Sequence, residues 1–288
     1  MAGFADVEFW TAADGARLAL RREAARGERR AALVLVHGFG DHSGRYAHVA
    51  DWLAGRGIAV FALDQRGHGR SPGPRGHVAR FAQYLSDIVA LRRLVAAETP
   101  GPQLLLGHSF GGLVVLRFLE TAPAGLAGAA VTSPLVDVSM PVPRWKMLLG
   151  RALADLAPAL PFRMGVEYGH LSTDPAIEAQ VENDPLHHDV MSPRAYFESL
   201  QARRALCAES GRIAVPVFFG LAGDDRIASL PAARAFALGL VADVTLKVYD
   251  GFYHEVLHER DRARVLDDLG LWMDRVLEAP AERPVRSA

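Results

Sequence analysis

Residues 107–111, Gly-His-Ser-Phe-Gly, carry the residue types of a nucleophilic hydrolase. The pattern Gly-x-Ser-x-Gly is typical of a nucleophile elbow, a tight turn between a strand and a helix that exposes the serine hydroxyl. The strained turn leaves no room for side chains two residues before and two residues after the serine. An apolar run, Gln103–Leu106, precedes the motif, and a helical pattern, Leu113–Glu120, follows it. This context predicts that Ser109 is a catalytic nucleophile.

A second match to the same pattern lies at residues 69–73, Gly-Arg-Ser-Pro-Gly. The residue after a nucleophile must donate its backbone N–H to the oxyanion, and Pro72 has no N–H. The prolines and glycines that follow also favour a loop over a helix. We therefore expect Ser71 to be structural.

A nucleophilic serine needs a basic histidine and a carboxylate that orients it, in the chain order serine, acid, histidine for α/β hydrolases. Asp224 and Asp225 follow the apolar run Val215–Leu221, and His254 follows Thr245–Tyr249. Ligands bind at the carboxyl ends of such strands. His254 is therefore the predicted base, in preference to His258, which lies one helical turn further along the chain. Spacing alone leaves both aspartates open as the acid.

A third apolar run, Leu33–Val36, ends in His37-Gly38-Phe39-Gly40. The backbone N–H of Phe39 is in position to be one oxyanion donor, and the N–H of Phe110, directly after the nucleophile, to be the other. The alternative is that residues 37–40 form a plain turn after a strand.

Short apolar runs alternate with longer helical patterns along the chain. Strands are expected at Ala32–Val36, Ala59–Leu63, Gln103–Leu106, Ala129–Thr132, Val215–Leu221 and Thr245–Tyr249. Helices are expected at Tyr46–Ala54, Phe81–Ala97, Gly111–Glu120, Pro231–Leu240 and Arg260–Leu277. This order is typical of a mostly parallel, doubly wound sheet, and uninterrupted apolar runs suit strands covered on both faces. Val7–Thr11 and Arg17–Arg22 flank Asp14-Gly15 and predict a hairpin at the sheet edge.

Residues 138–210 interrupt this alternation with prolines and helical material. Apolar residues from Trp145 to Leu156 form one helical stripe, which includes Leu149 and Leu153. We expect this segment to be a helical lid inserted into a core of residues 1–137 and 211–278. The alternative is a pair of extra core helices. The polar tail at 279–288 is expected to be disordered.

Composition excludes several function classes. The 288 residues carry 32 basic and 33 acidic side chains, a net charge of −1, which provides no basic surface for nucleic acid. The single cysteine cannot form an internal disulfide. No apolar run approaches the roughly 18 residues of a membrane-spanning helix, and the first ten residues lack a signal-peptide pattern, so a cytoplasmic location is expected. No spacing indicates a metal site, the pair His187-His188 included, and no cofactor is expected.

Three stretches together resemble the monoacylglycerol lipase and lysophospholipase branch of the α/β-hydrolase superfamily: residues 37–46, residues 64–71 and the serine motif. Shorter matches are Asn183-Asp184-Pro185-Leu186, Asp225-Arg226 and Gly251-Phe252-Tyr253-His254. The chain departs from the family where Met often follows the nucleophile, since it has Phe110, and in the acid loop, where Ala222 replaces a usual glycine.

The resemblance implies a triad of Ser109, Asp225 and His254, an oxyanion hole at Phe39 and Phe110, and a structural role for the 64–71 loop. It also implies a small-molecule acyl ester as substrate, monoacylglycerol or lysophospholipid-like, cleaved through an acyl-enzyme. The lid would bury the acyl chain, with Leu149 and Leu153 facing the pocket or a lipid surface. A peptidase, a thioesterase, an acyltransferase and a ligand-binding relative without turnover remain alternatives.

Overall fold

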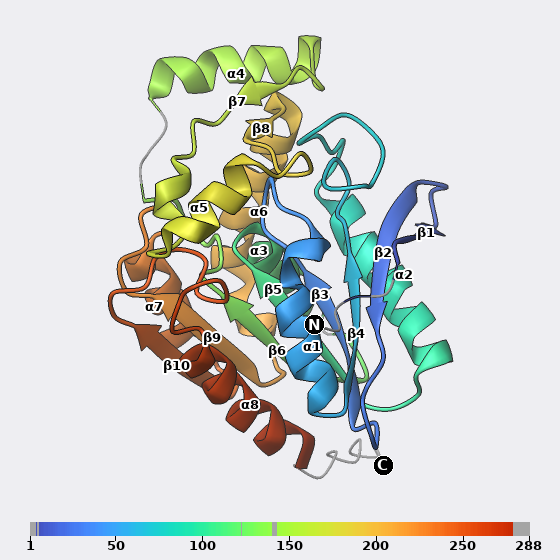
Figure 1. Ribbon diagram of the computed structural model, residues 1–288. Coiled ribbons are helices and arrows are strands. Elements are labelled where there is room, and N and C mark those ends of the chain that lie inside the picture. The colour runs from blue at the N-terminus through green and yellow to red at the C-terminus, as the bar shows by residue number, and fades with distance from the viewer. Residues whose placement is uncertain (1–3, 5, 122, 140–142, 279–288) are drawn as a thin grey trace, which may run out of the picture.

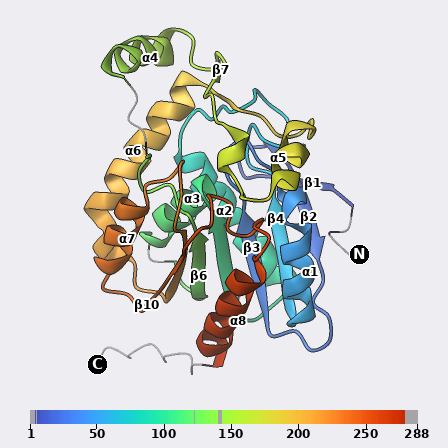
Figure 2. The ribbon, with the colours of Figure 1, turned by 60° about the vertical axis from the view of Figure 1, so that its left-hand side comes forward.

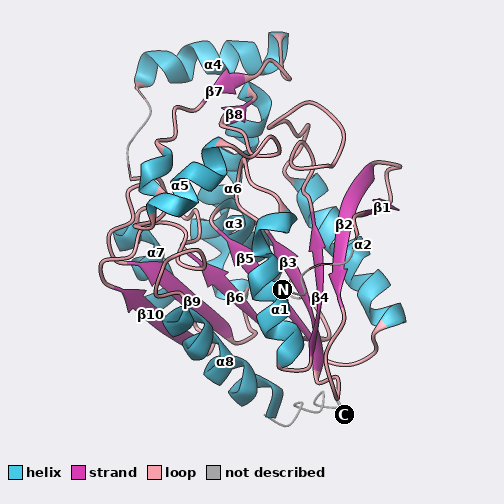
Figure 3. Ribbon diagram, viewed as in Figure 1, coloured by secondary structure: helices cyan, strands magenta, loops and turns pink. Residues whose placement is uncertain are grey.

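The computed structural model describes residues 4, 6–121, 123–139 and 143–278. Within them, eight strands form one sheet in the order β1 (Glu8–Thr11), β2 (Arg17–Glu23), β4 (Ile58–Leu63), β3 (Ala31–Val36), β5 (Gln103–His108), β6 (Leu126–Thr132), β9 (Val217–Ala222) and β10 (Val244–Tyr249) (Figures 1 and 3). β2 pairs antiparallel with β1 and β4, and all other neighbours are parallel. The predicted doubly wound sheet with a hairpin at its edge is confirmed.

Helices cover both faces of this sheet (Figures 1 and 2). α1 (Ala47–Gly55) and α8 (Ala263–Glu278) pack on one face, with the side chains of Leu33 and Leu35. α2 (Ala82–Glu98), α3 (Phe110–Leu119) and α7 (Leu230–Leu238) pack on the other, with Val34 and Val36. Successive side chains of a strand point to opposite faces, so an uninterrupted apolar strand supplies both cores.

Two strands differ from the expectation. β9 begins at Val217, after Pro216, which has no N–H to donate to a ladder. β10 was expected to be a buried strand, but it forms the edge of the sheet and most of its residues are half-buried. The polar residues Thr245 and Lys247 alternate with Leu246 and Val248, which is typical of a half-buried strand, and β10 has a neighbouring strand on one side only.

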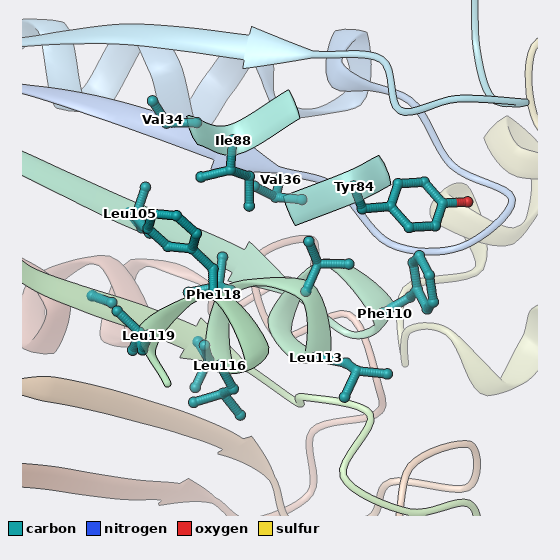
Figure 4. Packing of buried hydrophobic residues seen from close by; sticks show 14 of the residues in the cluster. Val34, Val36, Tyr84, Ile88, Leu105, Phe110, Leu113, Leu116, Phe118 and Leu119 are labelled. Atoms are coloured by element: carbon teal, nitrogen blue, oxygen red, sulfur yellow. The ribbon is translucent and has the colours of Figure 1, made fainter. Parts of the chain in front are cut away.

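Helix α3, which follows the serine motif, is the most buried helix of the core. Its apolar side chains pack against the strands and against α2, as Figure 4 shows. The residues in this contact are Val34, Val36, Tyr84, Ile88, Leu105, Phe110, Leu113, Leu116, Phe118 and Leu119. A helix held on all sides gives the turn before it a fixed position.

The chain between β6 and β9 forms the inserted segment. It contains α4 (Arg144–Leu156), β7 (Phe162–Arg163), the 3₁₀ turn η2 (Tyr168–His170), α5 (Pro175–Glu182), β8 (Val190–Met191), α6 (Pro193–Glu209) and the 3₁₀ turn η3 (Ser210–Arg212). α6 packs on α3 and adds Ala195, Ala202 and Leu206 to the core, whereas α4 lies outermost (Figure 2). The segment thus contains both an extra core helix and an outer helix. The tail at 279–288 lies outside the described residues.

Candidate active site

Ser109 lies in a tight turn between β5 and α3. Its φ of +53° is in the left-handed region, which a residue with a side chain adopts only when the surroundings impose it. Its N–H donates to the Thr132 carbonyl (2.9 Å), and its own carbonyl accepts from Leu113 and Leu135 (3.1 and 2.9 Å). These three bonds fix the turn from both sides.

Steric crowding explains why the motif has glycine two residues before and two residues after Ser109. A Cβ on Gly107 would lie 2.5 Å from the Gly111 carbonyl oxygen, and one on Gly111 would lie 2.1 Å from that of Val36. Neither contact is possible for a real side chain. The turn can therefore form only if both positions are glycine, as the sequence pattern indicated.

A chain of hydrogen bonds links Ser109, His254 and Asp225. The Nε2 atom of His254 lies 2.7 Å from the Ser109 Oγ, and its Nδ1 lies 2.8 Å from the Asp225 Oδ2. The side chains of His254 and Asp225 are nearly inaccessible to solvent. In this geometry the carboxylate accepts a hydrogen bond from Nδ1–H, which leaves Nε2 unprotonated and able to accept the proton of the serine hydroxyl.

The two adjacent aspartates have different surroundings. Asp225 contacts His254 with one oxygen, and its other oxygen, Oδ1, accepts from the N–H groups of Ile227 and Ala228 (both 2.9 Å). Asp224 is exposed, and its N–H donates to the Phe252 carbonyl (3.0 Å). The structure therefore brings Asp225, and not Asp224, against the histidine.

Charges in the site shift two pKa values. Burial by itself lowers the pKa of His254, but the adjacent Asp225 carboxylate and the hydrogen bond to it outweigh burial, so the pKa is raised above its ordinary value. Burial by itself raises the pKa of Asp225, but His254 and the two backbone N–H donors outweigh it, so that pKa is lowered. Asp225 is thus ionised at neutral pH, and His254 is a stronger base than a free histidine.

The loop after β3 lies beside the nucleophile. A Cβ on Gly38 would approach the Ser109 Cβ to 3.5 Å. The backbone N–H of Gln65 donates to His37 Nε2 (2.9 Å) and its side-chain amide donates to the His37 carbonyl (2.7 Å), so two bonds hold the start of this loop. Within the described part of the chain, the N–H groups of Phe39 and Phe110 form none of the hydrogen bonds that hold the turns and loops. Their role as oxyanion donors stays a prediction.

Phe110 is the residue directly after the nucleophile, where the sequence departs from the family pattern named above. Its ring is buried and packs edge-on against Tyr84, Phe81 and Phe39, at centroid distances of 5.3, 6.0 and 5.7 Å. Phe110 is therefore part of an aromatic cluster under the elbow.

The other candidate residues lie away from this cluster. The Ser71 hydroxyl is buried, donates to the Asp64 carbonyl and accepts from the Ala19 N–H (2.9 Å). His258 Nε2 lies 3.2 Å from the Arg45 carbonyl, and burial lowers its pKa to about 3, which makes it a poor base. His188 Nε2 lies 3.0 Å from the Gly67 carbonyl. All three contacts are structural.

Helix α4 exposes to solvent most of the apolar stripe that runs from Trp145 to Leu156. Leu149 is 54% exposed and Leu153 is half-buried, so Leu149 faces solvent in this structure, and the expectation that the stripe faces the pocket or a lipid surface stays a prediction. α4 packs on α6 through its opposite face: Gly150 leaves room for the Phe197 ring, and the Tyr196 hydroxyl donates to the Met147 sulfur (3.3 Å). Periodicity reveals an apolar stripe but not what covers it.

Neither a metal-binding cluster nor a membrane-spanning helix is present in the residues that the structure describes. Within them, no group of three or more His, Cys, Asp or Glu side chains is arranged to hold a metal ion. None of the helices in the described ranges combines the length and apolar character needed to cross a membrane.

Several ionisable residues near the site form contacts that the sequence motifs did not predict. Arg45 forms a two-bonded ion pair with Glu255 (2.8 and 2.6 Å), the residue after His254. His42 pairs with Asp184 of the inserted segment (2.8 Å). The Glu259 carboxylate accepts hydrogen bonds from the backbone N–H groups of Thr173 and Tyr253 (3.0 and 2.7 Å). Arg45, His42 and Asp184 lie in stretches quoted for the family resemblance, which is the one signal that could have singled them out.

Comparison with known proteins places this chain among hydrolases. The family model described as serine aminopeptidase, S33, matches residues 27–261. The monoacylglycerol lipase of Mycolicibacterium smegmatis is 31% identical over 247 residues, 85% of this chain and 88% of that protein. The human monoglyceride lipase is 29% identical over 284 residues, 94% of this chain and 91% of that protein.

A solved structure has a similar fold over most of the chain. The crystal structure of the Paleococcus ferrophilus monoacylglycerol lipase matches with a TM-score of 0.81 and 29% identity, covering 90% of this chain and 99% of that one. The predicted α/β-hydrolase fold and the resemblance are both confirmed. The chain belongs to the serine aminopeptidase S33 family, in the monoacylglycerol lipase branch of the α/β-hydrolase superfamily.

Proposed function

We propose that this carboxylic ester hydrolase cleaves monoacylglycerols or esters like them, with Ser109 as nucleophile, His254 as base and Asp225 as the orienting acid. The observation that carries the proposal is the hydrogen-bonded chain from Ser109 Oγ through His254 to Asp225, centred on a serine with positive φ. The choice of substrate is supported by the names of the relatives, which are monoacylglycerol lipases over nearly the whole chain.

The proposed reaction has two halves. In the first, the Ser109 oxygen attacks the ester carbonyl carbon while His254 Nε2 takes the hydroxyl proton. The carbonyl oxygen becomes an oxyanion, which accepts hydrogen bonds from the N–H groups of Phe39 and Phe110. His254 then gives its proton to the leaving glycerol oxygen, and the acyl group stays on Ser109. In the second half, water attacks the acyl-enzyme with the same base, and the fatty acid leaves.

A substrate panel tests this proposal. The purified protein is assayed with 1- and 2-monoacylglycerols and lysophospholipids, and with p-nitrophenyl esters of increasing chain length. We expect glycerol monoesters to have the highest kcat/KM. Turnover of none of these esters by a folded protein would contradict the proposal and favour a relative that binds ligands without cleaving them.

A peptidase is the second candidate, because the matching family model is described as a serine aminopeptidase. The same triad attacks amides, so the arrangement of Ser109, His254 and Asp225 does not separate the two substrates. Aminoacyl p-nitroanilides in the same panel do separate them. A kcat/KM on an anilide above that on every ester would replace the esterase proposal.

The pH dependence of the rate follows from the raised pKa of His254. The base must be neutral to accept the serine proton, so kcat/KM falls as the pH drops through the His254 pKa. Because Asp225 raises that pKa, we expect the acid limb of the profile to have its midpoint above about 6.5, the ordinary histidine value. The measurement is kcat/KM between pH 4 and 9 on a soluble ester. A midpoint at or below the ordinary value would contradict the assigned base.

The exposed stripe of α4 is proposed to contact lipid surfaces. Leu148 and Leu149 are 76% and 54% exposed, which is unusual for neighbouring leucines unless a surface covers them. We expect Leu148→Ser with Leu149→Ser to lower the rate on monoacylglycerol in vesicles several-fold and to leave the rate on a soluble short-chain ester unchanged. Each lost leucine contact with lipid is worth about 1.5–3 kcal/mol at most.

Leu271→Ser is the matched control, since Leu271 is 71% exposed on α8, in the core domain. It should leave both rates unchanged. Equal losses on vesicle and soluble substrates in the double variant would show that the stripe supports the fold or the site instead of binding lipid.

A further inference from the structure

Glu259 is a buried carboxylate that the proposed reaction does not use. It is 1% exposed, and no cationic side chain in the described residues forms an ion pair with it. A buried charge of this kind is costly unless hydrogen bonds replace the lost water. Hydrogen-bond donors of the protein must therefore replace the water that the Glu259 carboxylate lost on burial.

Donors from two separate parts of the chain surround this carboxylate. One part is Tyr253, whose backbone N–H donates to Oε1 (2.7 Å). The other is the inserted segment between η2 and α5, where the Thr173 N–H donates to Oε1 (3.0 Å), the Ser172 hydroxyl to Oε2 (3.0 Å) and the Thr173 hydroxyl also to Oε2. Charge-assisted bonds of this type are stronger than neutral ones. Glu259 thus joins the inserted segment to the His254 loop.

The hydrogen bond from Tyr253 connects Glu259 to the loop that carries the proposed base, His254. Tyr253 directly precedes His254, so the bond to Glu259 holds the backbone on one side of the base. On the other side, the Glu255 N–H donates to the Leu171 carbonyl (2.7 Å), which belongs to the same stretch of the inserted segment. Backbone hydrogen bonds therefore hold the residues on both sides of His254. One bond goes directly to Leu171, and the other goes to Glu259, which residues 172–173 hold in turn.

We propose that Glu259 is a positioning residue, which holds His254 between Ser109 and Asp225 and makes the position of the base depend on the inserted segment. The proposal rests on the role of His254 in the proposed function. The reasoning is geometric: Nε2 and Nδ1 must both stay within hydrogen-bonding distance of their partners, and a displacement of about 1 Å can lower a rate by roughly 100-fold.

The first test is Glu259→Gln, which keeps the shape of the side chain. With its oxygen at the Oε1 position, glutamine keeps the bonds from the N–H groups of Tyr253 and Thr173. It loses the negative charge, however, and its NH₂ group faces the hydroxyls of Ser172 and Thr173, which can no longer donate there. We expect kcat to fall roughly 10- to 100-fold with KM nearly unchanged. Glu182→Gln, an exposed glutamate of the inserted segment, is the matched control and should behave like the wild type.

Two readouts separate positioning from a purely structural role. The rate at which a fluorophosphonate labels Ser109 depends on the base and not on the identity of the substrate, and it should fall by the same factor as kcat. The acid limb of the pH profile should also shift toward lower pH, because a displaced His254 loses part of its contact with Asp225. Unchanged kcat, labelling rate and pH profile in folded Glu259→Gln would overturn the proposal, as would a loss of thermal stability alone.

A second variant, in the inserted segment, tests the contact between residues 172–173 and Glu259. Thr173→Val removes the hydroxyl donor and keeps the N–H and the branched shape, so we expect a smaller loss of labelling rate than in Glu259→Gln. This variant also tests the proposal if Glu259→Gln does not fold. If folded Thr173→Val were labelled at the rate of the wild type, the proposal would be overturned. If the wild type is labelled but cleaves no ester, the proposed substrate is wrong while the labelling comparison still tests Glu259.

Discussion

Replacement of Ser109 by alanine is expected to lower kcat by several orders of magnitude, roughly 10⁴- to 10⁶-fold, without unfolding the protein. The hydroxyl is the atom that would attack the ester, and water held in its place would be a far weaker nucleophile. Binding and the oxyanion donors at Phe39 and Phe110 would remain, which accounts for the residual rate. The measurement is kcat on the best ester of the panel, with circular dichroism as the check on folding.

Ser71→Ala is the control for this experiment, because Ser71 is the serine of the second Gly-x-Ser-x-Gly match. Its hydroxyl forms two buried hydrogen bonds, so the substitution should lower the free energy of unfolding by about 1–3 kcal/mol and spare kcat. If Ser109→Ala retained a tenth of the activity while folded Ser71→Ala lost it, the nucleophile would be Ser71.

Asp225→Asn is expected to lower kcat roughly 10³- to 10⁴-fold, the magnitude given for the same change in a serine protease triad. Asparagine presents an NH₂ group to His254 Nδ1 and favours the tautomer that carries its proton on Nε2, which cannot accept the serine proton. The negative charge that stabilises the imidazolium is lost as well.

Asp224→Asn provides the matched comparison, one residue away in the same loop. The Asp224 side chain is exposed, and its backbone N–H, which binds the Phe252 carbonyl, is retained in the variant. We expect a change in kcat of less than about tenfold, since the Asp224 side chain is exposed and forms neither hydrogen bond of the triad. The reverse ranking of the two variants would assign the acid to Asp224.

The sequence alone predicted the elbow and the order of the elements because both depend on local chemistry. Two glycines around Ser109 are required by clashes within a few residues and with the neighbouring strand β3. Uninterrupted apolar runs identify the inner strands, since a strand covered on both faces needs apolar side chains at every position. His254 followed from the same logic, as a residue just past a strand end.

The tertiary structure decided what depends on contacts between distant segments. Asp224 and Asp225 are equivalent in spacing, and the bonds from Ile227 and Ala228 turn one of them toward His254. The stripe of α4 is plain in the sequence, but its exposure follows from the packing of the opposite face on α6. Glu259 has no local signal, because its four donors come from residues 172–173 and 253. Periodicity and motif spacing describe one segment at a time, whereas these features arise where two segments meet.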